Sequence, residues 1–472
     1  RFMLYSLGGN HEPCLSLLDI YDTVGCSYRK QCYHQENPPH YSGNFWWSTA
    51  EYIRSLSVSK LKEKYDAEFW LFENNPLFFN ICSLQHLYEI SYPLELYKDA
   101  VDKSFEEQII YCKFGDTGLG LCNQLYSLVN SILIGKIFPG FSTIILSDFL
   151  CDYSNNSYCI PNAILDIPKL NESLVSHQLQ IVSISDVQFD IVQVEFGLKP
   201  HNVIDITEKI KKEFLHERVL EIPKGTNLNV LCEDGDPAVG IHKQLYVTYI
   251  VNGYMHYTMF DEYIMLKLEP IKLDFKYFSH LPVTSRTNIR HAKQQVELFN
   301  VFLKNIPFES RFYDATLEFT KSLPTISYNV MHLRLEEDAI PFWANINGIE
   351  PSLYKSILEQ KYIRIIQEHI SPDTNTVLLS SSTDNAITQY MTKHNYKFHF
   401  MNKTHFEGRD VNAILDLLIG QQCNNIFVGN VNPYNGNGST FSYTILNALR
   451  NNTEVTKICI DTDRIFDPEY IL

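Results

Sequence analysis

Apolar positions in the first half of the chain follow a strand–turn–helix pattern. An apolar run at 109–112 leads into a glycine-containing turn at 115–120, and the segment 121–137 then repeats apolar residues at helical spacing. This order is typical of the opening of an α/β nucleotide-binding unit. Three further apolar runs are typical of buried strands: 143–146, 180–184 and 229–232.

A second series of the same kind begins near residue 300. Strand-like runs alternate there with stretches of helical spacing, and this alternation favours a parallel sheet. The predicted strands are 327–334, 377–379, 397–400, 425–428 and 457–460. The predicted helices are 354–369, 411–421 and 441–450. The two series together predict an α/β fold with two Rossmann-like domains that face one another.

Composition then narrows the class of protein. Of the 472 residues, 45% are hydrophobic and 20% are charged, which suffices for packed cores and excludes a disordered chain. The net charge of −16 excludes a non-specific nucleic-acid binder, because such a protein needs a basic surface to neutralise phosphates. No stretch approaches the ~18 consecutive apolar residues of a membrane-spanning helix. The chain opens with Arg1 rather than Met, so we expect it to be part of a longer polypeptide.

The cysteines bear on the cellular compartment. Eleven of them are scattered from Cys14 to Cys459, an odd number without paired CxxC spacing. This pattern disfavours a disulfide scaffold and favours reduced thiols. We therefore expect a cytoplasmic location.

The segment 331–338 carries the most informative polar pattern. Four ionisable residues alternate at spacing two directly after an apolar strand: His332, Arg334, Glu336 and Asp338. If the strand continues, all four side chains point to one side at its carboxyl end, where ligands bind in open α/β sheets. A guanidinium group can donate two parallel hydrogen bonds to two phosphate oxygens, so the presence of Arg334 here indicates an anion site. A salt-bridged strand end on the surface is the alternative.

Two predicted helices begin at turns that suit anions. Gly120 ends a glycine-containing turn before the first helix, although Asn123 replaces the third glycine of a dinucleotide fingerprint. Ser439 or Thr440 can cap the helix predicted at 441–450. The free backbone N–H groups of a helix start attract negative charge. An ordinary tight turn and plain helix capping are the alternatives.

Metal-binding patterns are weak in this sequence. Two DxD sequences occur, at 234–236 and 461–463, and about one such pair is expected by chance in a chain of this length. The 16 histidines show no HExxH and no paired Cys/His spacing. We therefore expect no metal cofactor.

Taken together, the polar segments resemble the motifs of the GDP-fucose fucosyltransferase superfamily, the protein O-fucosyltransferase-like group in particular. The family's G-x-G-N-Q turn matches 120–124, with Cys122 in place of the second glycine, which puts a thiol close to the expected ligand. The HxR motif matches His332-Leu333-Arg334, and the S-T-F-S helix start matches 439–442. A helical Asp before a strand matches Asp416. The order and spacing agree over roughly residues 104–472.

The resemblance implies a GT-B-like fold, with an acceptor-side Rossmann-like domain at 104–300 and a GDP-sugar-binding Rossmann-like domain at 301–472. It also implies an inverting, metal-independent transfer from GDP-fucose. Arg334 would hold the β-phosphate and stabilise the leaving GDP, Asn123 would lie near the reacting sugar, and Asp416 would contact guanine. Glu336 and Asp338 are candidates for the general base. The implied donor-binding residues are Gly120, Asn123, His332, Arg334, Asp416, Ser439, Thr440 and Phe441.

Residues 1–98 carry a separate resemblance. Tyr21-Asp22-Thr23-Val24-Gly25, followed by 40–47, resembles the C-terminal portion of small GT-A-like transferases of large DNA viruses and microbes. This implies the remnant of a preceding GT-A-like domain, although packing in an aromatic core is the favoured interpretation of Trp46 and Trp47. The whole chain then resembles the distal part of a chlorovirus-type multi-domain glycosyltransferase. Its partners would include other glycosyltransferase domains of the same polypeptide, and its location the host cytoplasm.

These resemblances give one hypothesis and two alternatives. The chain is expected to move fucose from GDP-fucose to a glycan hydroxyl, in viral glycan synthesis. The alternative of the same class is a transferase that uses GDP-mannose, GDP-rhamnose or a UDP-sugar. The alternative of another class is a non-catalytic GT-B-like scaffold that binds glycan.

Overall fold

The structure is a computed structural model of the chain. It describes residues 4–9, 11–19, 21–26, 28–29, 40–41, 46–57, 69–74, 76, 78–81, 108–114, 120–137, 141–152, 155, 157–187, 189–198, 202–216, 219–232, 235–251, 254–263, 265–268, 280–283, 296–337, 339–380, 382–403 and 405–472. None of the helices in these ranges is long and apolar enough to cross a membrane.

The chain forms two compact units, each made of several separate segments. Unit 1 comprises 1–113, 131–147 and 173–293, and unit 2 comprises 114–130, 148–172 and 294–472. Helix α5 (Leu121–Ile137) contributes residues to both. The division into 1–98, 104–300 and 301–472 stays a prediction.

The N-terminal part of unit 1 contains a small mixed sheet. Its order is β4 (Trp46–Ser48), β1 (Thr23–Cys26), β5 (Phe78–Ile81). Trp46 packs against a core that includes Tyr41 and Phe72, and the Trp47 indole N–H donates to the Leu7 carbonyl at 3.2 Å. Trp46 thus takes part in the aromatic core and Trp47 in a hydrogen bond, while the GT-A-like origin of this segment stays a prediction. The other elements here are η1 (Leu4–Gly9), α1 (His11–Leu17), β2 (Tyr28–Arg29), β3 (His40–Tyr41) and α2 (Ala50–Ser55).

A four-stranded parallel sheet follows in unit 1. Its order is β10 (Gln180–Ser183), β7 (Phe141–Leu146), β6 (Gln108–Cys112), β18 (His280–Val283), with every neighbouring pair parallel. Three of the apolar runs predicted as strands are therefore strands of one sheet. The helix predicted at 121–137 is α5.

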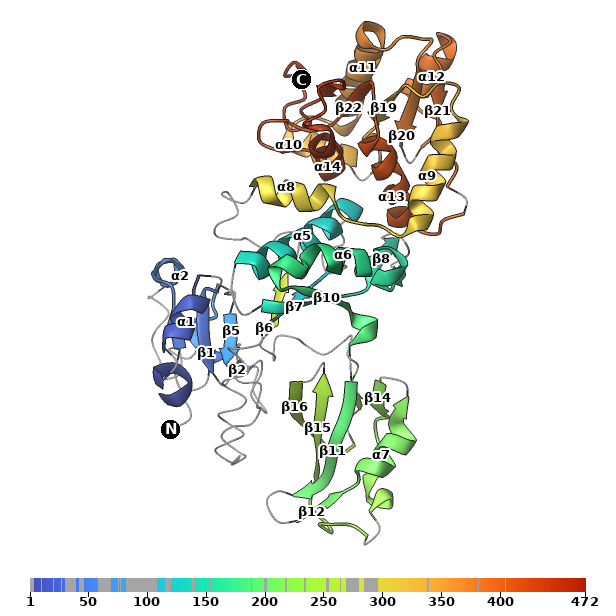
Figure 1. Ribbon diagram of the computed structural model, residues 1–472. Coiled ribbons are helices and arrows are strands. Elements are labelled where there is room, and N and C mark those ends of the chain that lie inside the picture. Colours follow the sequence, from blue (N-terminus) through green and yellow to red (C-terminus); the bar gives the residue numbers. More distant parts are fainter. Residues whose placement is uncertain are drawn as a thin grey trace. The chain divides into compact units, whose positions relative to one another are not determined.

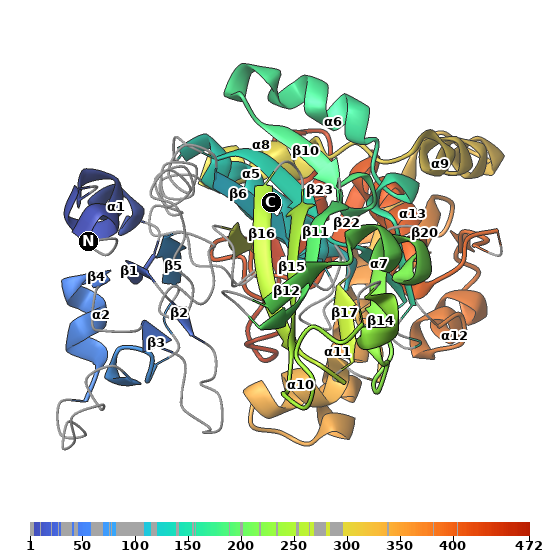
Figure 2. The same cartoon turned by 90° about the horizontal axis from the view of Figure 1, so that it is seen from below.

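Unit 1 also holds an antiparallel sheet that the sequence patterns did not predict. Its order is β12 (Asn202–Asp205), β11 (Phe189–Leu198), β15 (Gln244–Val251), β16 (Tyr254–Asp261), and α7 (Thr207–Phe214) packs on β11 (Figure 2). This sheet lies inside the range expected to be purely Rossmann-like. The run 229–232, predicted as a strand, is mostly a 3-10 helix, η6 (Leu228–Leu231). The strand prediction is wrong because the Asn227 side chain accepts from the Asn229 N–H at 3.1 Å and starts a helical turn.

The remaining elements of this part of the chain are short. They are β8 (Phe149–Asp152), β9 (Ser157–Cys159), η3 (Pro161–Ala163), α6 (Ile167–Leu174), η4 (Val175–His177), η5 (Ile184–Asp186), β13 (Leu215–His216), β14 (Val219–Ile222) and β17 (Leu266–Leu268).

Unit 2 is built on a six-stranded sheet. The order is β21 (Phe398–His399), β20 (Asn375–Leu379), β19 (Tyr328–His332), β22 (Ile426–Gly429), β23 (Thr456–Cys459), β24 (Tyr470–Ile471), and only β24 is antiparallel to its neighbour. The five strands predicted from apolar runs form its parallel part. Alternate residues of β19 bury on opposite faces, and Met331 joins the core that contains Tyr354 and Ile366.

Helices cover both faces of this sheet. Figure 1 shows α11 (Pro351–His369) on one side of the central strands and α13 (Arg409–Gln421) on the other. Helix α10 (Ala339–Ile346) and α12 (Ala386–Lys393) pack against α11, while α14 (Thr440–Leu449) packs against α13. Helix α8 (Val296–Lys304) packs against α14, and α9 (Ser310–Ser322) against α13.

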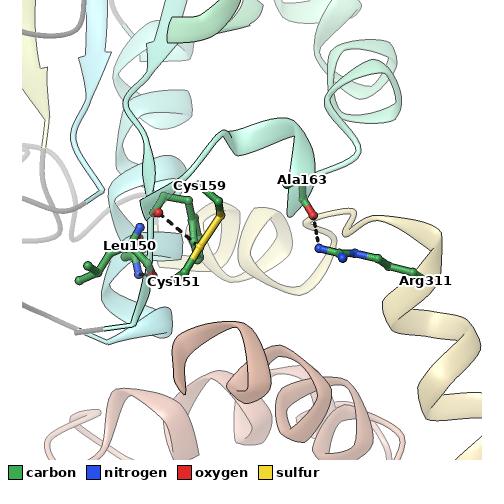
Figure 3. Close-up of a disulfide and its surroundings, with 7 residues drawn as sticks. Leu150, Cys151, Cys159, Ala163 and Arg311 are labelled. Carbon is green, nitrogen blue, oxygen red and sulfur yellow. Dashed lines mark hydrogen bonds between the residues drawn. A yellow bond between two sulfur atoms is a disulfide. The ribbon is translucent and has the colours of Figure 1, made fainter. Parts of the chain in front are cut away.

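One disulfide differs from the expectation of reduced thiols. Cys151 and Cys159 are joined across the antiparallel hairpin of β8 and β9 (Figure 3). Nearby, the Arg311 guanidinium donates to the Ala163 carbonyl at 2.8 Å and ties α9 to this segment of unit 2. The seven other described cysteines are buried. The expectation is therefore wrong for the Cys151–Cys159 pair, which closes a short loop of the chain.

Candidate functional site

The parallel sheet of unit 2 changes direction between β19 and β22. The chain runs from β19 through β20 to β21 toward one edge, and then from β22 through β23 to β24 toward the other. Such a switch point leaves room beyond the carboxyl ends of the two central strands, and ligands of open α/β sheets bind there. Strand β19 ends at His332 and β22 at Gly429. His332 and Asn430 therefore mark the candidate site.

A buried hydrogen-bond network holds the end of β19. The Tyr362 hydroxyl lies 2.7 Å from the His332 carbonyl and accepts from the Arg334 N–H at 3.0 Å. The Asn430 side chain donates to the same His332 carbonyl at 2.7 Å, and its Oδ1 lies 2.8 Å from the Tyr362 hydroxyl. These bonds take the Arg334 N–H out of the strand ladder. The expected continuation of the strand to 334 is therefore wrong, and the residues after His332 lie in a loop.

His332 is buried against the first turn of α14. Its Nδ1 lies 2.7 Å from the Ser442 Oγ, and its ring centre lies 4.9 Å from that of Phe441. Burial and, to a lesser extent, the charge of Arg334 lower the pKa of His332 to about 3. The imidazole is therefore neutral near pH 7 and acts through hydrogen bonds rather than as a cation.

Arg334 and Glu336 form an ion pair in the loop after β19. Arg334 Nη1 lies 3.0 Å from Glu336 Oε2, and their side chains are 25% and 15% exposed. A guanidinium group carries five N–H donors, so one carboxylate does not exhaust its capacity for an anion. Asp338 lies outside the described residues, and its role as a base stays a prediction.

Asp416 lies in α13 and is paired with Lys403. The Lys403 ammonium donates to Asp416 Oδ2. Burial raises the pKa of Asp416; the Lys403 charge opposes this rise, and the Glu336 charge adds to it. Glu336 thus acts electrostatically on Asp416, as the smallest of these influences.

The start of α14 lies at the end of β22. Ser439 Oγ accepts from the Ser442 N–H at 3.4 Å and caps the helix, while the Ser439 N–H donates to the Asn430 carbonyl at 2.8 Å. The intervening loop closes on itself through a bridge between Val431 and Gly438. The first-turn N–H groups of a helix, which include those of Thr440 and Phe441 here, have no partner within the helix and favour an anion. Capping and anion binding are compatible at this position.

The start of α5 lies against α13 within unit 2. The Leu121 N–H donates to Asp410 Oδ1 at 2.9 Å. A Cβ at Gly120 would lie 3.2 Å from the same oxygen, so the absence of a side chain permits this close approach. Asn123 is half-buried in the first turn, and its N–H donates to the Gly120 carbonyl at 3.0 Å.

Helix α5 also contacts α14. The Tyr126 hydroxyl lies 3.4 Å from the Thr440 carbonyl. The Cys122 thiol is hydrogen-bonded to Thr444, and burial raises the pKa of Cys122 to about 12. The thiol is thus a buried, protonated packing group between helices near pH 7, and its closeness to a ligand stays a prediction.

Gln124, the last residue of the turn that resembles G-x-G-N-Q, has a structural role. Its side chain donates to the Leu150 carbonyl and accepts from the Leu150 N–H, both at 2.9 Å, and it is fully buried. Gln124 therefore acts as a clamp that fixes the backbone of β8 on α5.

The structure brings several predicted residues together and adds others. His332 contacts Phe441, Arg334 contacts Glu336, and Asp416 is linked to that pair by charge. Tyr362 had no predicted role, whereas a polar residue directly after a strand, as at Asn430, is a usable signal. Ser442 and Gln124 stood inside the quoted motifs without a role. The role of Asp410 could not be recognised from the sequence, because its partner Leu121 is 289 positions away.

Neither DxD sequence forms a metal centre in the described residues. No group of three or more His, Cys, Asp or Glu side chains that could hold a metal occurs in that part of the chain. Asp461 accepts from the Asn432 side chain at 2.7 Å and from the Asp463 N–H at 3.1 Å. Asp236 pairs with the buried Lys243 at 3.1 Å, and Asp234 lies outside the described residues.

The low pKa of His332 predicts a pH-dependent stability. The pKa falls from 6.5 to about 3 on folding, so the unfolded chain binds a proton that the folded chain does not. The free energy of unfolding should therefore decrease as the pH falls from 6.5 toward 3. Denaturant titrations across this window measure the slope. His332→Asn should flatten it, whereas the exposed His405→Asn should not; equal slopes in all three proteins would contradict the buried neutral imidazole.

Solved structures of fucosyltransferases are similar to this chain at low sequence identity. POFUT1 in complex with GDP-fucose is 11% identical, with 73% of this chain and 94% of that chain covered and a TM-score of 0.38. POFUT1 in complex with GDP is also 11% identical, with 75% and 98% covered and a TM-score of 0.39. The fucosyltransferase NodZ from Bradyrhizobium is 11% identical, with 78% and 98% covered and a TM-score of 0.36. No protein-family model and no curated protein matches the chain.

Proposed function

We propose that this chain is a glycosyltransferase that moves fucose from GDP-fucose to a glycan hydroxyl. The observation that carries the proposal is the convergence of three motifs far apart in the sequence. His332 of the HxR motif contacts Ser442 and Phe441 of the S-T-F-S motif. Tyr126, just after the turn that resembles G-x-G-N-Q, contacts Thr440.

The proposed chemistry is stabilisation of the departing diphosphate. Transfer of the sugar leaves negative charge on the β-phosphate, and donors fixed in advance stabilise that charge without reorganisation. Arg334 supplies the guanidinium, and the first turn of α14 at Ser439–Phe441 supplies backbone N–H groups. Neutral His332 supplies a further hydrogen bond without a second positive charge. Gly120 and Asn123 would lie near the donor phosphates and the reacting sugar.

The proposed guanine contact involves Asp416. Lys403 engages its Oδ2, so guanine N–H groups would donate to the other oxygen, Oδ1. Burial raises the pKa of Asp416 and the Lys403 charge opposes that rise, so Lys403 favours the ionised carboxylate that guanine N–H groups need as an acceptor. A uracil ring presents a carbonyl beside a single N–H and fits this acceptor less well.

The general base and the metal requirement complete the proposal. Glu336 is already paired with Arg334, so a role as base would require that pair to open when the donor binds. We propose an inverting, metal-independent reaction, because Arg334 and the helix start can carry the charge that a metal carries elsewhere. The viral role, the cytoplasmic location and the partner domains stay predictions from the sequence.

Binding of GDP tests the proposed donor. GDP should raise the unfolding temperature more than UDP does at equal concentration, because guanine presents two adjacent N–H donors to Asp416 Oδ1 whereas uracil presents one. At a GDP concentration of 100 Kd the stabilisation should be about 2.7 kcal/mol. The measurement is a thermal unfolding series with GDP, UDP and inorganic diphosphate, run in EDTA so that it also tests metal independence.

One control variant and two possible contrary results complete the test of the proposed donor. Arg464→Ala, which changes an exposed arginine of unit 2, should keep the full GDP shift. Preferential stabilisation by UDP would replace the proposed donor with a UDP-sugar, and no shift with any nucleotide would favour the non-catalytic scaffold.

A further inference from the structure

The Ser442 hydroxyl lies between two groups whose hydrogen-bonding roles can be assigned. Its Oγ is 2.8 Å from the Asn430 backbone nitrogen and 2.7 Å from His332 Nδ1. A backbone N–H can only donate, so Ser442 Oγ is the acceptor in the first bond. The hydroxyl then has its single hydrogen left to donate, and Nδ1 is the acceptor that the described residues offer to it. Ser442 is fully buried, so water does not compete for that hydrogen.

The protonation state of the ring completes the assignment. Because the pKa of His332 is lowered to about 3, the imidazole carries one hydrogen near pH 7. A ring whose Nδ1 accepts must carry that hydrogen on Nε2. The opposite tautomer would present two N–H donors to Ser442 Oγ and leave the buried hydroxyl hydrogen without this acceptor, which is unfavourable for a buried polar group.

The assignment is reinforced by a closed circuit of bonds. The Asn430 side chain donates to the His332 carbonyl at 2.7 Å, and the Asn430 backbone N–H donates to Ser442 Oγ. Ser442 in turn bonds the His332 ring. Backbone and ring of His332 are therefore held by the same two residues, which fixes both the position and the orientation of the imidazole.

We propose that Ser442 is a positioning residue that fixes His332 as the Nε2–H tautomer, so that the imidazole presents a neutral donor to an anionic ligand. The identity of that ligand as the diphosphate of the donor rests on the proposed function, whereas the tautomer does not. With the hydrogen on Nδ1 instead, the ring would present the lone pair of Nε2 and repel phosphate oxygens. Ser442 thus decides whether His332 assists or opposes Arg334.

Nitrogen NMR of the full-length protein, labelled with ¹⁵N-histidine, tests the tautomer directly. The His332 signals are identified by their loss in His332→Gln. Near neutral pH, Nδ1 should resonate as an unprotonated and Nε2 as a protonated imidazole nitrogen. The reverse pattern, or two protonated nitrogens, would overturn the proposal. This experiment needs no ligand, so its outcome is independent of whether the chain binds GDP.

Two variants test the role of Ser442. In Ser442→Ala the two His332 nitrogens should move toward a common intermediate shift, because both tautomers become populated, while Ser442→Thr should restore the wild-type pattern. Where GDP binds the wild-type protein, Ser442→Ala should weaken it by roughly three- to tenfold and Ser442→Thr should not. Ser322→Ala, which removes an exposed helix-end hydroxyl, is the matched control. An unchanged His332 pattern in Ser442→Ala would remove Ser442 from this role, and absence of GDP binding to wild type would count against the proposed function alone.

Discussion

Replacing Arg334 with alanine is expected to lower the rate of GDP release from GDP-fucose by about 10²–10³-fold, the usual cost of removing one preorganised donor from a developing oxyanion. Arg334 is the cation placed at the end of β19, and its backbone is fixed by Tyr362. The other donors of the proposed site are neutral, so no second charge compensates for its loss. The measurement is GDP release with water as the acceptor, which needs no knowledge of the glycan.

The controls separate charge from geometry. Arg334→Lys keeps the charge but not the paired donors of the guanidinium group, so it should recover only part of the rate. Arg464→Ala removes an arginine whose side chain is 74% exposed and should leave the rate unchanged. Wild-type turnover in Arg334→Ala would exclude Arg334 from the reaction, whatever nucleotide the chain binds.

Replacing Gln124 with alanine is expected to lower the free energy of unfolding by about 2–6 kcal/mol. The side chain satisfies both the N–H and the carbonyl of Leu150, and each buried backbone group left without a partner costs about 1–3 kcal/mol. The empty space left by a fully buried side chain adds to that cost. Urea unfolding of the wild-type and variant proteins measures the difference.

Gln124→Glu is a sharper test of the same clamp. A carboxylate can accept from the Leu150 N–H but faces the Leu150 carbonyl without a hydrogen, so this variant should also be destabilised. Gln389→Ala removes an amide that, among the described residues, donates to the exposed Asp384, and it should change stability little. A loss below about 0.5 kcal/mol in Gln124→Ala, the range of ordinary surface substitutions, would show that Leu150 finds other partners.

Local periodicity predicted the regular elements of unit 2 well. The apolar runs at 327–334, 377–379, 425–428 and 457–460 are neighbours in one parallel sheet, because fully buried strands read as continuous apolar runs. The helix predicted at 354–369 begins three residues earlier, at Pro351, since proline suits the first turn of a helix. These features depend on residues close together in the sequence.

Interactions between residues far apart in the sequence could not be predicted from local periodicity. The end of β19 at His332 depends on a tyrosine hydroxyl thirty positions away, so apolar alternation alone extended the strand to 334. Likewise, nothing in the sequence indicated that Asp416 is mostly buried and paired with Lys403, because both read as ordinary charged residues. The antiparallel sheet at 189–261 was missed because its strands pair within unit 1 without the crossover helices that mark a parallel sheet.

The bond between Leu121 and Asp410 has a consequence for synthesis on the ribosome. The two residues are 289 positions apart, so at about 5–20 residues per second Asp410 emerges roughly 15–60 s after Leu121. Throughout that interval the nascent α5 lacks the carboxylate that caps its first turn. Gln124 can engage Leu150 almost at once, because only 26 positions separate them. The growing chain can therefore fix this helix early through Gln124, whereas the carboxylate that caps the first turn of the helix becomes available only after 289 further positions.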